Sequence, residues 1–283
     1  MWERASSEGH SGARLAERRR LRRRRIFIAS GVLFILALGA IVYGLWQEPV
    51  RISRVAIYGS PAPAGVEQLL TDIGAAAMQG AYLGIIPRDS ILFFPAARIR
   101  ADLIAARPEI AAVSIFRNGL TGLTIKIDER AAIARWCGLA HTEGVEEYCY
   151  FFDAKGYVFA PAATTTQAIN PFGLYAPLVG ETLEPLGATI ANANKLPSTF
   201  DFARQLGTLG SPVERIVIRD DEVDQHLASG TRVTYVLDDE QNAFTALVSA
   251  RDSLNLADGS LEYVDLRFGG KMYVKKKEGS GRQ

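Results

Sequence analysis

One apolar segment limits what this chain can fold into more than any other feature. Residues Ile26 to Trp46 form twenty-one consecutive positions without a charged side chain. A helix of that length rises about 30 Å, which matches the hydrocarbon core of a bilayer. The segment therefore predicts a transmembrane helix over residues 26–46, with the lipid bilayer as a partner of the chain.

The residues before the apolar segment indicate which way it crosses. Residues 1–25 contain nine arginines and three glutamates. Basic residues beside a spanning helix stay on the cytoplasmic side. Residues 1–25 are thus predicted to be a basic cytoplasmic tail, and everything after Trp46 is predicted to lie outside the cytoplasm. The arginines that directly precede the helix and carry this topology signal are Arg22, Arg23, Arg24 and Arg25.

Two other interpretations of this N-terminal region are weighed against the anchor. A cleaved signal peptide would have small residues near its end, as Ala37 and Gly39 are here. The apolar run continues past them to Tyr43 and Trp46, whose aromatic rings suit the headgroup level of a retained helix. The arginines could also bind nucleic acid, but basic residues abutting a span already have a role in topology. No nucleic-acid partner is predicted.

The composition after the tail is that of ordinary globular domains. Of 32 Lys and Arg residues nine precede Ile26, and of 31 Asp and Glu residues three do, so 23 bases and 28 acids remain, a net charge of −5. About 230 external residues are enough for one large or two small domains.

The first external segment predicts a small α+β domain over residues 50–130. Its two helices would cover one face of a sheet, and Asn118-Gly119 is a strong hairpin signal between the last two strands. This is the size and order, βααββ, of a POTRA domain. The expected elements are a strand over 51–59, a helix over 64–78, a helix between Pro95 and Pro108, and strands over 111–117 and 123–128.

Residues 131–275 predict a mostly antiparallel β domain with flanking helices. Residues 160–177 have neither a helical nor a strand period and are predicted to be a loop. Acidic clusters at 220–224 and 238–240 lack the spacing of a calcium loop and are predicted to be solvated turns, with Asp238 or Asp239 available to cap the next helix. Residues 276–283 are predicted to be a disordered tail. The expected strands lie at 132–136, 148–152, 157–159, 213–218, 231–237 and 261–274, and the expected helices at 198–206 and 242–254.

The two cysteines, Cys137 and Cys149, both fall in the external part, where thiols can oxidise. The segment between them is polar and contains glycine, as in a hairpin loop, so a disulfide is predicted. A zinc site with His141 is the alternative, but two cysteines and one histidine leave the ion without a fourth ligand. No metal site is predicted.

Recurrent enzymatic signatures are missing from the sequence. It contains no G-x-S-x-G, S-x-x-K, H-E-x-x-H or P-loop pattern, and only three histidines. No catalytic residues, cofactor or small-molecule substrate are predicted.

The C-terminal strand has two interpretations, a strand with all its pairs made inside the sheet or an edge strand that binds another protein. A chain that ends in a strand often leaves a sheet edge open, and such an edge can accept a strand from another protein. Gly269-Gly270 within this segment marks a bulge or a turn. The residues predicted to bind a partner along an edge strand are Tyr263, Val264, Asp265, Leu266, Arg267, Phe268, Met272 and Val274.

Several short patterns together resemble the bacterial cell-division protein family FtsQ/DivIB. Their order and spacing over residues ~20–275 carry the resemblance, since each pattern by itself is short. They are Ile52-x-x-Val55-x-Ile57-x-Gly59 after a single span, Pro108-x-Ile110-x-x-Val113-x-Ile115-x-Arg117, Leu123-x-Ile125-x-Ile127-x-Glu129-Arg130, Ala134-x-Trp136, Asp153-x-x-Gly156-x-Val158-Phe159 and Val264-Asp265-Leu266-Arg267-Phe268.

The resemblance implies a single-pass inner-membrane protein of the division septum that has no catalytic activity and assembles other division proteins. It implies that the β domain binds small bitopic partners of the FtsB/DivIC and FtsL kinds, with a partner strand added to the last strand. Two alternatives stay open. One is a membrane-anchored envelope enzyme, and the other is a POTRA-bearing envelope assembly factor.

Overall fold

The computed structural model describes residues 9–59, 66–142, 148–162, 168–180 and 184–277. The chain divides into two compact units, which are described separately. Unit 1 comprises Met1–Ala105 and Ala112–Ile127, and unit 2 comprises Ala106–Ala111 and Asp128–Gln283. The overall class is α+β, with an N-terminal apolar helix and a large, mostly antiparallel sheet, as the sequence predicts.

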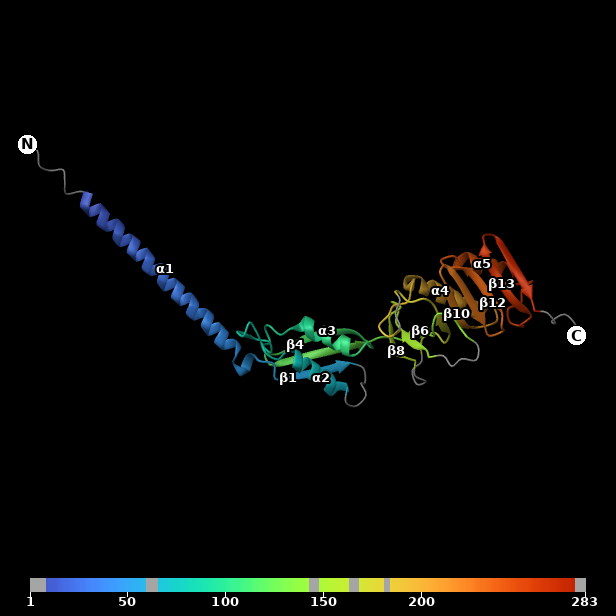
Figure 1. The fold of residues 1–283 in the computed structure, drawn as a ribbon, viewed down its shortest axis with the longest axis horizontal. Helices are drawn as coiled ribbons and strands as arrows, with labels where there is room; N and C mark the ends of the chain where they lie inside the picture. The colour runs from blue at the N-terminus through green and yellow to red at the C-terminus, as the bar shows by residue number, and fades with distance from the viewer. Residues whose placement is uncertain (1–8, 60–65, 143–147, 163–167, 181–183, 278–283) are drawn as a thin grey trace, which may run out of the picture. The chain divides into compact units, whose positions relative to one another are not determined.

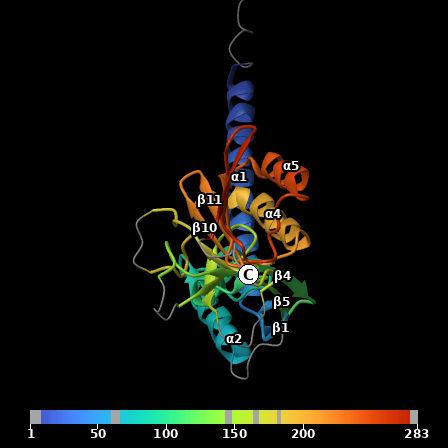
Figure 2. The ribbon, with the colours of Figure 1, turned by 90° about the vertical axis from the view of Figure 1, so that its right-hand side faces the viewer.

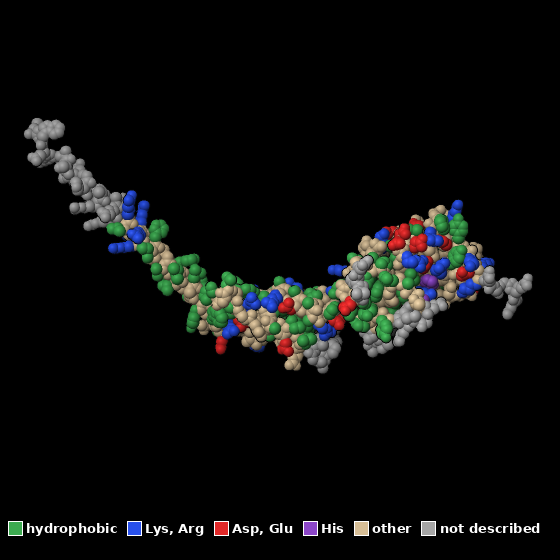
Figure 3. Space-filling model, viewed as in Figure 1, with side chains coloured by type: hydrophobic (Ala, Val, Ile, Leu, Met, Phe, Trp, Pro, Cys, Tyr) green, Lys and Arg blue, Asp and Glu red, His purple; other side chains and the backbone are tan. Residues whose placement is uncertain are grey.

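The N-terminal helix α1 (Gly9–Leu45) is longer than the apolar segment alone. Its part from Arg20 to Leu45 is apolar enough and long enough to span a membrane, and none of its most apolar window is buried inside the protein. Figure 3 shows hydrophobic side chains covering this part of the helix, after basic side chains near its start. A 3-10 turn (η1, Glu48–Val50) follows directly.

The folded part of unit 1 has the predicted order of strand, helix, helix, strand, strand (Figure 1). Its sheet has the order β1-β5-β4, with β1 parallel to β5. Ile99 and Leu103 of the second helix are fully buried, as are Leu123 and Ile125 of β5. The elements are β1 (Arg54–Gly59), α2 (Val66–Ala77), α3 (Ala96–Ala106), β4 (Ile110–Asn118) and β5 (Gly122–Glu129).

One further element of unit 1 has no counterpart in the sequence prediction. Strands β2 (Ala81–Tyr82) and β3 (Ile86–Pro87) form a short antiparallel hairpin between the two helices. Two residues a strand are too few for a hydrophobic period to be visible.

Unit 2 contains a nine-stranded sheet in the order β14-β13-β12-β11-β10-β9-β6-β7-β8. Most neighbours are antiparallel, but β12 pairs with β13, β10 with β9, and β6 with β9 in parallel. The strands are β6 (Ala134–Trp136), β7 (Tyr150–Phe152), β8 (Val158–Pro161), β9 (Gly173–Tyr175), β10 (Val213–Arg219), β11 (Glu222–Leu227), β12 (Arg232–Val236), β13 (Leu261–Phe268) and β14 (Lys271–Lys276).

Two helices cover one face of this sheet. Helix α4 (Leu196–Thr208) follows a 3-10 turn (η2, Ala193–Lys195) and connects β9 to β10, and α5 (Glu240–Ala250) connects β12 to β13. Parallel neighbours require such crossovers. Figure 2 shows both helices on the same side of the strands, and their apolar faces join the sheet in one core. Phe202 of α4 meets Tyr235 of β12 edge to face, with ring centroids 4.7 Å apart.

The prediction of a structureless loop over residues 160–177 is wrong in part. Strand β9 lies inside that range, between β10 and β6, and all three of its residues are buried. So short a strand has no detectable period. It is stabilised by the strands on either side of it, which come from distant parts of the sequence.

The predicted tail is also corrected at its start. Lys276 is the last residue of β14 and pairs with Leu261, and Lys275 pairs with Tyr263. Residues 278–283 lie outside the described part of the chain. The predicted single strand over 261–274 is a hairpin of two strands, because Gly270 has a φ of +72° and lets the chain turn back.

A disulfide joins Cys137 to Cys149, as predicted. It ties the end of β6 to the start of β7, which pair antiparallel. The bridge closes the loop between these strands, whose residues 143–147 lie outside the described part of the chain. Disulfides are typical of compartments outside the cytoplasm.

Replacing both cysteines, Cys137→Ser with Cys149→Ser, should lower the free energy of unfolding of unit 2 by about 2–3 kcal/mol, because the unfolded loop regains its freedom. Urea unfolding of the full chain in detergent, followed by the fluorescence of buried Trp136, measures this. A reductant should weaken the natural protein and leave the double variant unchanged. Equal stability of the two oxidised proteins would contradict the role of the bridge.

Candidate partner-binding edge of the sheet

The sheet of unit 2 has two end strands, β14 and β8, among the strands that the structure describes. The prediction that Tyr263, Val264, Asp265, Leu266, Arg267 and Phe268 form an edge strand is wrong. These residues belong to β13, which lies between β12 and β14. Two strands of a hairpin, β13 and β14, lie where the sequence predicts a single strand. Met272 and Val274 do lie on the edge strand, because both belong to β14.

The edge strand β14 is mostly exposed along its six residues. Tyr273 is half exposed and Val274 is 41% exposed, while Met272 packs partly against the core. The ring of Tyr273 meets the ring of Phe268 edge to face at 5.3 Å, and Phe268 is also half exposed. Among the described strands, β14 pairs with β13 alone. An exposed aromatic pair on such an edge is suited to strand addition with side-chain contacts.

A groove of about 490 Å³ lies beside this edge, between α5 and the β13–β14 hairpin. Its helical wall is mixed, with Ala243 and Ala246 beside the polar Asn242 and Thr245. The apolar residues of its strand wall are Leu266, Phe268 and Met272. The groove and the edge are therefore continuous, so a segment paired with β14 can bury apolar side chains beside α5.

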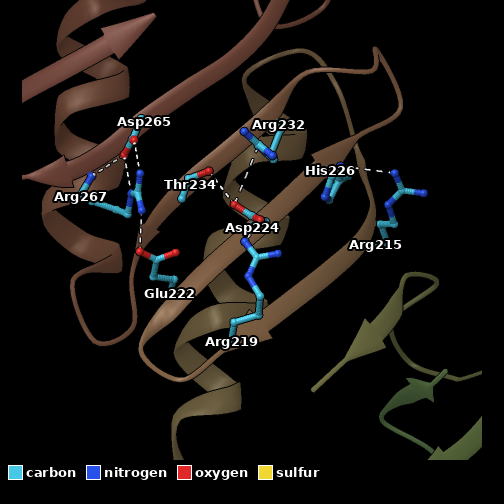
Figure 4. A network of polar contacts seen from close by, with 9 residues as sticks. All are labelled: Arg215, Arg219, Glu222, Asp224, His226, Arg232, Thr234, Asp265 and Arg267. Atoms are coloured by element: carbon cyan, nitrogen blue, oxygen red, sulfur yellow. Dashed lines mark hydrogen bonds and ion pairs between the residues drawn. The ribbon is translucent and has the colours of Figure 1, made fainter. Parts of the chain in front are cut away.

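The face of the sheet opposite the helices is polar and charged. Alternate residues of a strand point to opposite faces, so the residues that alternate with the core positions of β10 to β13 lie on this face. Figure 3 shows acidic, basic and histidine side chains intermixed over unit 2. The nine residues that form the polar network in Figure 4 are Arg215, Arg219, Glu222, Asp224, His226, Arg232, Thr234, Asp265 and Arg267.

Asp224 is the buried centre of this network. The prediction that residues 220–224 form a solvated turn holds for the turn at Asp220 and is wrong for Asp224, whose side chain is only 3% exposed. Its carboxylate pairs with Arg219 and accepts a hydrogen bond of 2.6 Å from the Thr234 hydroxyl, with the Arg232 guanidinium 4.0 Å away. A buried carboxylate needs such partners, because an unpaired one would lose its solvation.

The prediction of a solvated turn over residues 238–240 is also wrong at its last residue. Glu240 is buried and accepts a hydrogen bond from the Thr199 hydroxyl of α4 at 3.1 Å. Asp239 is the N-cap residue of α5, but its side chain makes no capping hydrogen bond. Asp238 pairs with Lys195 at 2.6 Å.

Arg267 ties β13 to the rest of the charged face. Its guanidinium makes a two-pronged contact with Asp265, with bonds of 3.0 and 2.7 Å, and also pairs with Glu222 on β11. The hydrogen bonds from Arg267 lower the pKa of the Asp265 carboxyl, so Asp265 stays ionised. The edge strand β14 thus pairs with β13, which is itself fixed by its pairing with β12 and by the contact of Arg267 with β11.

His226 lies on this face with a pKa well below that of a free histidine. Burial lowers its pKa to about 4 by disfavouring the imidazolium, and the nearby charge of Arg215 adds to the effect. The His226 Nδ1 lies 3.5 Å from Nη2 of Arg215. The imidazole is therefore neutral at neutral pH.

The sequence prediction missed this network, although a signal for it was present. Residues Glu222 to Leu227 place Val223 and Leu227 on one face and three titratable residues on the other, which is the period of a strand. The run of acids at its start concealed the period. Among the described residues, no three His, Cys, Asp or Glu side chains gather as metal ligands would.

Lowering the pH from about 6.5 to about 4.5 should destabilise unit 2 through His226. The unfolded histidine takes up a proton near pH 6.5, whereas the folded one does so only near pH 4, so protonation favours the unfolded chain in this window. Since the ring is only partly buried, the expected loss is about 1 kcal/mol. Urea unfolding of the full chain in detergent at both pH values measures it.

The matched variant is His226→Gln, which should lose this part of the pH dependence and keep any part that begins below pH 4, where carboxylates such as Asp265 titrate. An identical pH dependence in the variant and the natural protein would show that His226 is not its source.

Comparison with known proteins gives this chain no family. No protein-family model matches the sequence, and no curated protein matches it.

Proposed function

We propose that this chain is a non-catalytic, single-pass scaffold of the bacterial division septum, of the FtsQ/DivIB kind. Its extracytoplasmic domains would recruit and link other division proteins. The observation that carries the proposal is the edge at β14, which pairs only with β13 among the described strands and continues into a partly apolar groove. The same chain has a helix that is long and apolar enough to span a membrane.

The architecture of unit 1 supports a POTRA domain. Its elements follow the βααββ order, and its two helices supply the residues that pack on the three-stranded sheet, among them Ile99 and Leu103. In the proposed function this domain helps to recruit other division proteins.

The charge pattern and the disulfide support the proposed orientation. Arg22, Arg23, Arg24 and Arg25 precede the apolar part of α1 and would stay in the cytoplasm. The Cys137–Cys149 bridge suits an oxidising compartment on the other side of the membrane.

The charge of the edge supports a partner with acidic residues. Four lysines, at 271, 275, 276 and 277, lie on or just after β14, so a partner segment with acidic residues is favoured. A strand of a small bitopic protein of the FtsB/DivIC or FtsL kind would pair with β14, and its apolar side chains would contact Phe268, Tyr273 and Met272.

Proline substitution at two successive residues of β14 tests the edge. Backbone N–H groups alternate in direction along a strand, so one of Tyr273→Pro and Val274→Pro removes an N–H directed toward β13 and the other removes one directed outward. The outward variant should keep the stability of unit 2 and lose at least about tenfold in affinity for the bitopic partner, or about 1.4 kcal/mol.

The measurement is co-purification and titration of the full chain with its FtsB/DivIC-like partner in detergent, together with a fluorescent fusion imaged in dividing cells. The natural chain should gather at midcell, and its depletion should give filaments. Normal affinity in the proline variant that keeps its stability would exclude strand addition at β14, and an even envelope distribution with normal division would exclude the septal role.

A further inference from the structure

The β2–β3 hairpin of unit 1 lies directly beside the end of the apolar helix. Helix α1 ends at Leu45, and the indole Nε1 of Trp46 donates a hydrogen bond of 2.8 Å to the backbone carbonyl of Ile85, next to β3. Leu45 is buried at this junction. Trp at the end of a spanning helix prefers the headgroup level of the bilayer. The hairpin is therefore in direct contact with a side chain that is expected at the headgroup level of the bilayer.

The segment after the hairpin returns to the same place. The backbone N–H of Ile91 donates to the carbonyl of Val50 at 3.0 Å, and Arg51 pairs with Ser90. Residues 90–93 thus run alongside the chain that leaves the helix. The next two residues, Leu92 and Phe93, are 53% and 48% exposed.

The hairpin and this segment expose an unusual amount of apolar surface for so few residues. Leu83 at the tip is 96% exposed, and Ile85 is 52% exposed. Exposed apolar residues scattered singly need no explanation, but a cluster of them marks an interaction site. The exposed apolar residues of these two segments are Leu83, Ile85, Leu92 and Phe93, and both segments contact the chain directly after the helix.

The backbone conformation at the tip of the hairpin is unfavourable for a leucine at position 83. The N–H of Ile85 donates to the carbonyl of Tyr82, and the two residues between them, Leu83 and Gly84, have φ angles of 50° and 71°. This is a turn with two left-handed residues, which favours Asn, Asp or Gly at the first of them. Leucine disfavours this left-handed conformation, and the Leu83 side chain is almost fully exposed. Neither the backbone nor the packing of the domain therefore explains a leucine here, which leaves an interaction of its apolar side chain as the explanation.

We propose that the β2–β3 hairpin inserts its apolar tip into the outer leaflet of the membrane that α1 spans. The occupant of this surface is lipid because the hairpin is bonded to the residue that ends the span, so bilayer surrounds it once α1 is inserted. Arg88, whose guanidinium lies 5.2 Å from the Tyr82 ring, stands behind the tip, where it can reach headgroup phosphates. This inference rests on the anchoring part of the proposed function and not on the septal partners.

The test uses the full chain in vesicles of phosphatidylethanolamine and phosphatidylglycerol, with an environment-sensitive dye on Leu83→Cys. The two natural cysteines are bridged, so the introduced thiol is the one that reacts. The emission of the dye should lie at shorter wavelength than the emission of the same dye in water. Lipids with a nitroxide near the headgroup should quench it severalfold more than they quench the dye at the control position.

The matched control is Leu69→Cys on α2, a position that is exposed and apolar but follows the far end of β1. A second site, Leu33→Cys in the middle of the apolar part of α1, reports insertion, because nitroxides deep in the bilayer should quench it. Failure at Leu33 would count against the anchor itself. Deep quenching at Leu33 with a water-exposed dye at Leu83 would overturn the hairpin inference alone.

A charge at the tip gives an independent check. Leu83→Asp suits the left-handed backbone, so the domain should fold as before, yet a carboxylate resists entry into lipid. In this variant a dye on Leu92→Cys should lose its headgroup quenching. A dye that is shielded from water but untouched by nitroxide lipids would mean that protein covers the tip, and the inference would fall.

Discussion

The covering of one face of the nine-stranded sheet by α4 and α5 is the constraint on which the rest of unit 2 depends. Both helices are crossovers between parallel neighbours, and they bury the apolar residues of the central strands. Gln225 reinforces the arrangement from within, since its amide donates to the Thr199 carbonyl of α4 and to the Tyr235 hydroxyl. The residues of β11 to β13 on the other face are mostly polar or charged, and the Asp224 and Arg267 contacts lie there.

The same arrangement explains why the edge strand β14 can accept a partner strand and yet resists unselected pairing. β13 is held by β12 on one side and β14 on the other, and Arg267 connects it to β11. β14 has a described neighbour on one side only, so its outward backbone groups stay exposed. The lysines along it discourage pairing with unselected strands, as charged edge residues generally do, while the aromatic pair of Phe268 and Tyr273 favours a matched partner.

The folded part of unit 1 meets a different physical demand, because it follows directly after a helix that could span a membrane. A domain at that place has one end facing polar headgroups and lipid, so apolar residues that would be a liability in water become favourable there. The bond from Trp46 to Ile85 links this end of the domain to the helix. With α1 inserted as proposed, the exposed apolar side chains at the helix end would contact lipid instead of water.

The sequence alone determined the apolar helix, the order of the main elements and the pairing of Cys137 with Cys149. Each follows from local signals: a charge-free run, periods of 3.6 or 2 residues, and two cysteines beside a polar hairpin loop. The tertiary structure alone decided that β9 is an inner strand, that Asp224 is buried, and that β14 rather than β13 is the edge. These depend on which distant segments pair side by side, and the burial of a residue in a sheet is set by its neighbours across the strands rather than along the chain.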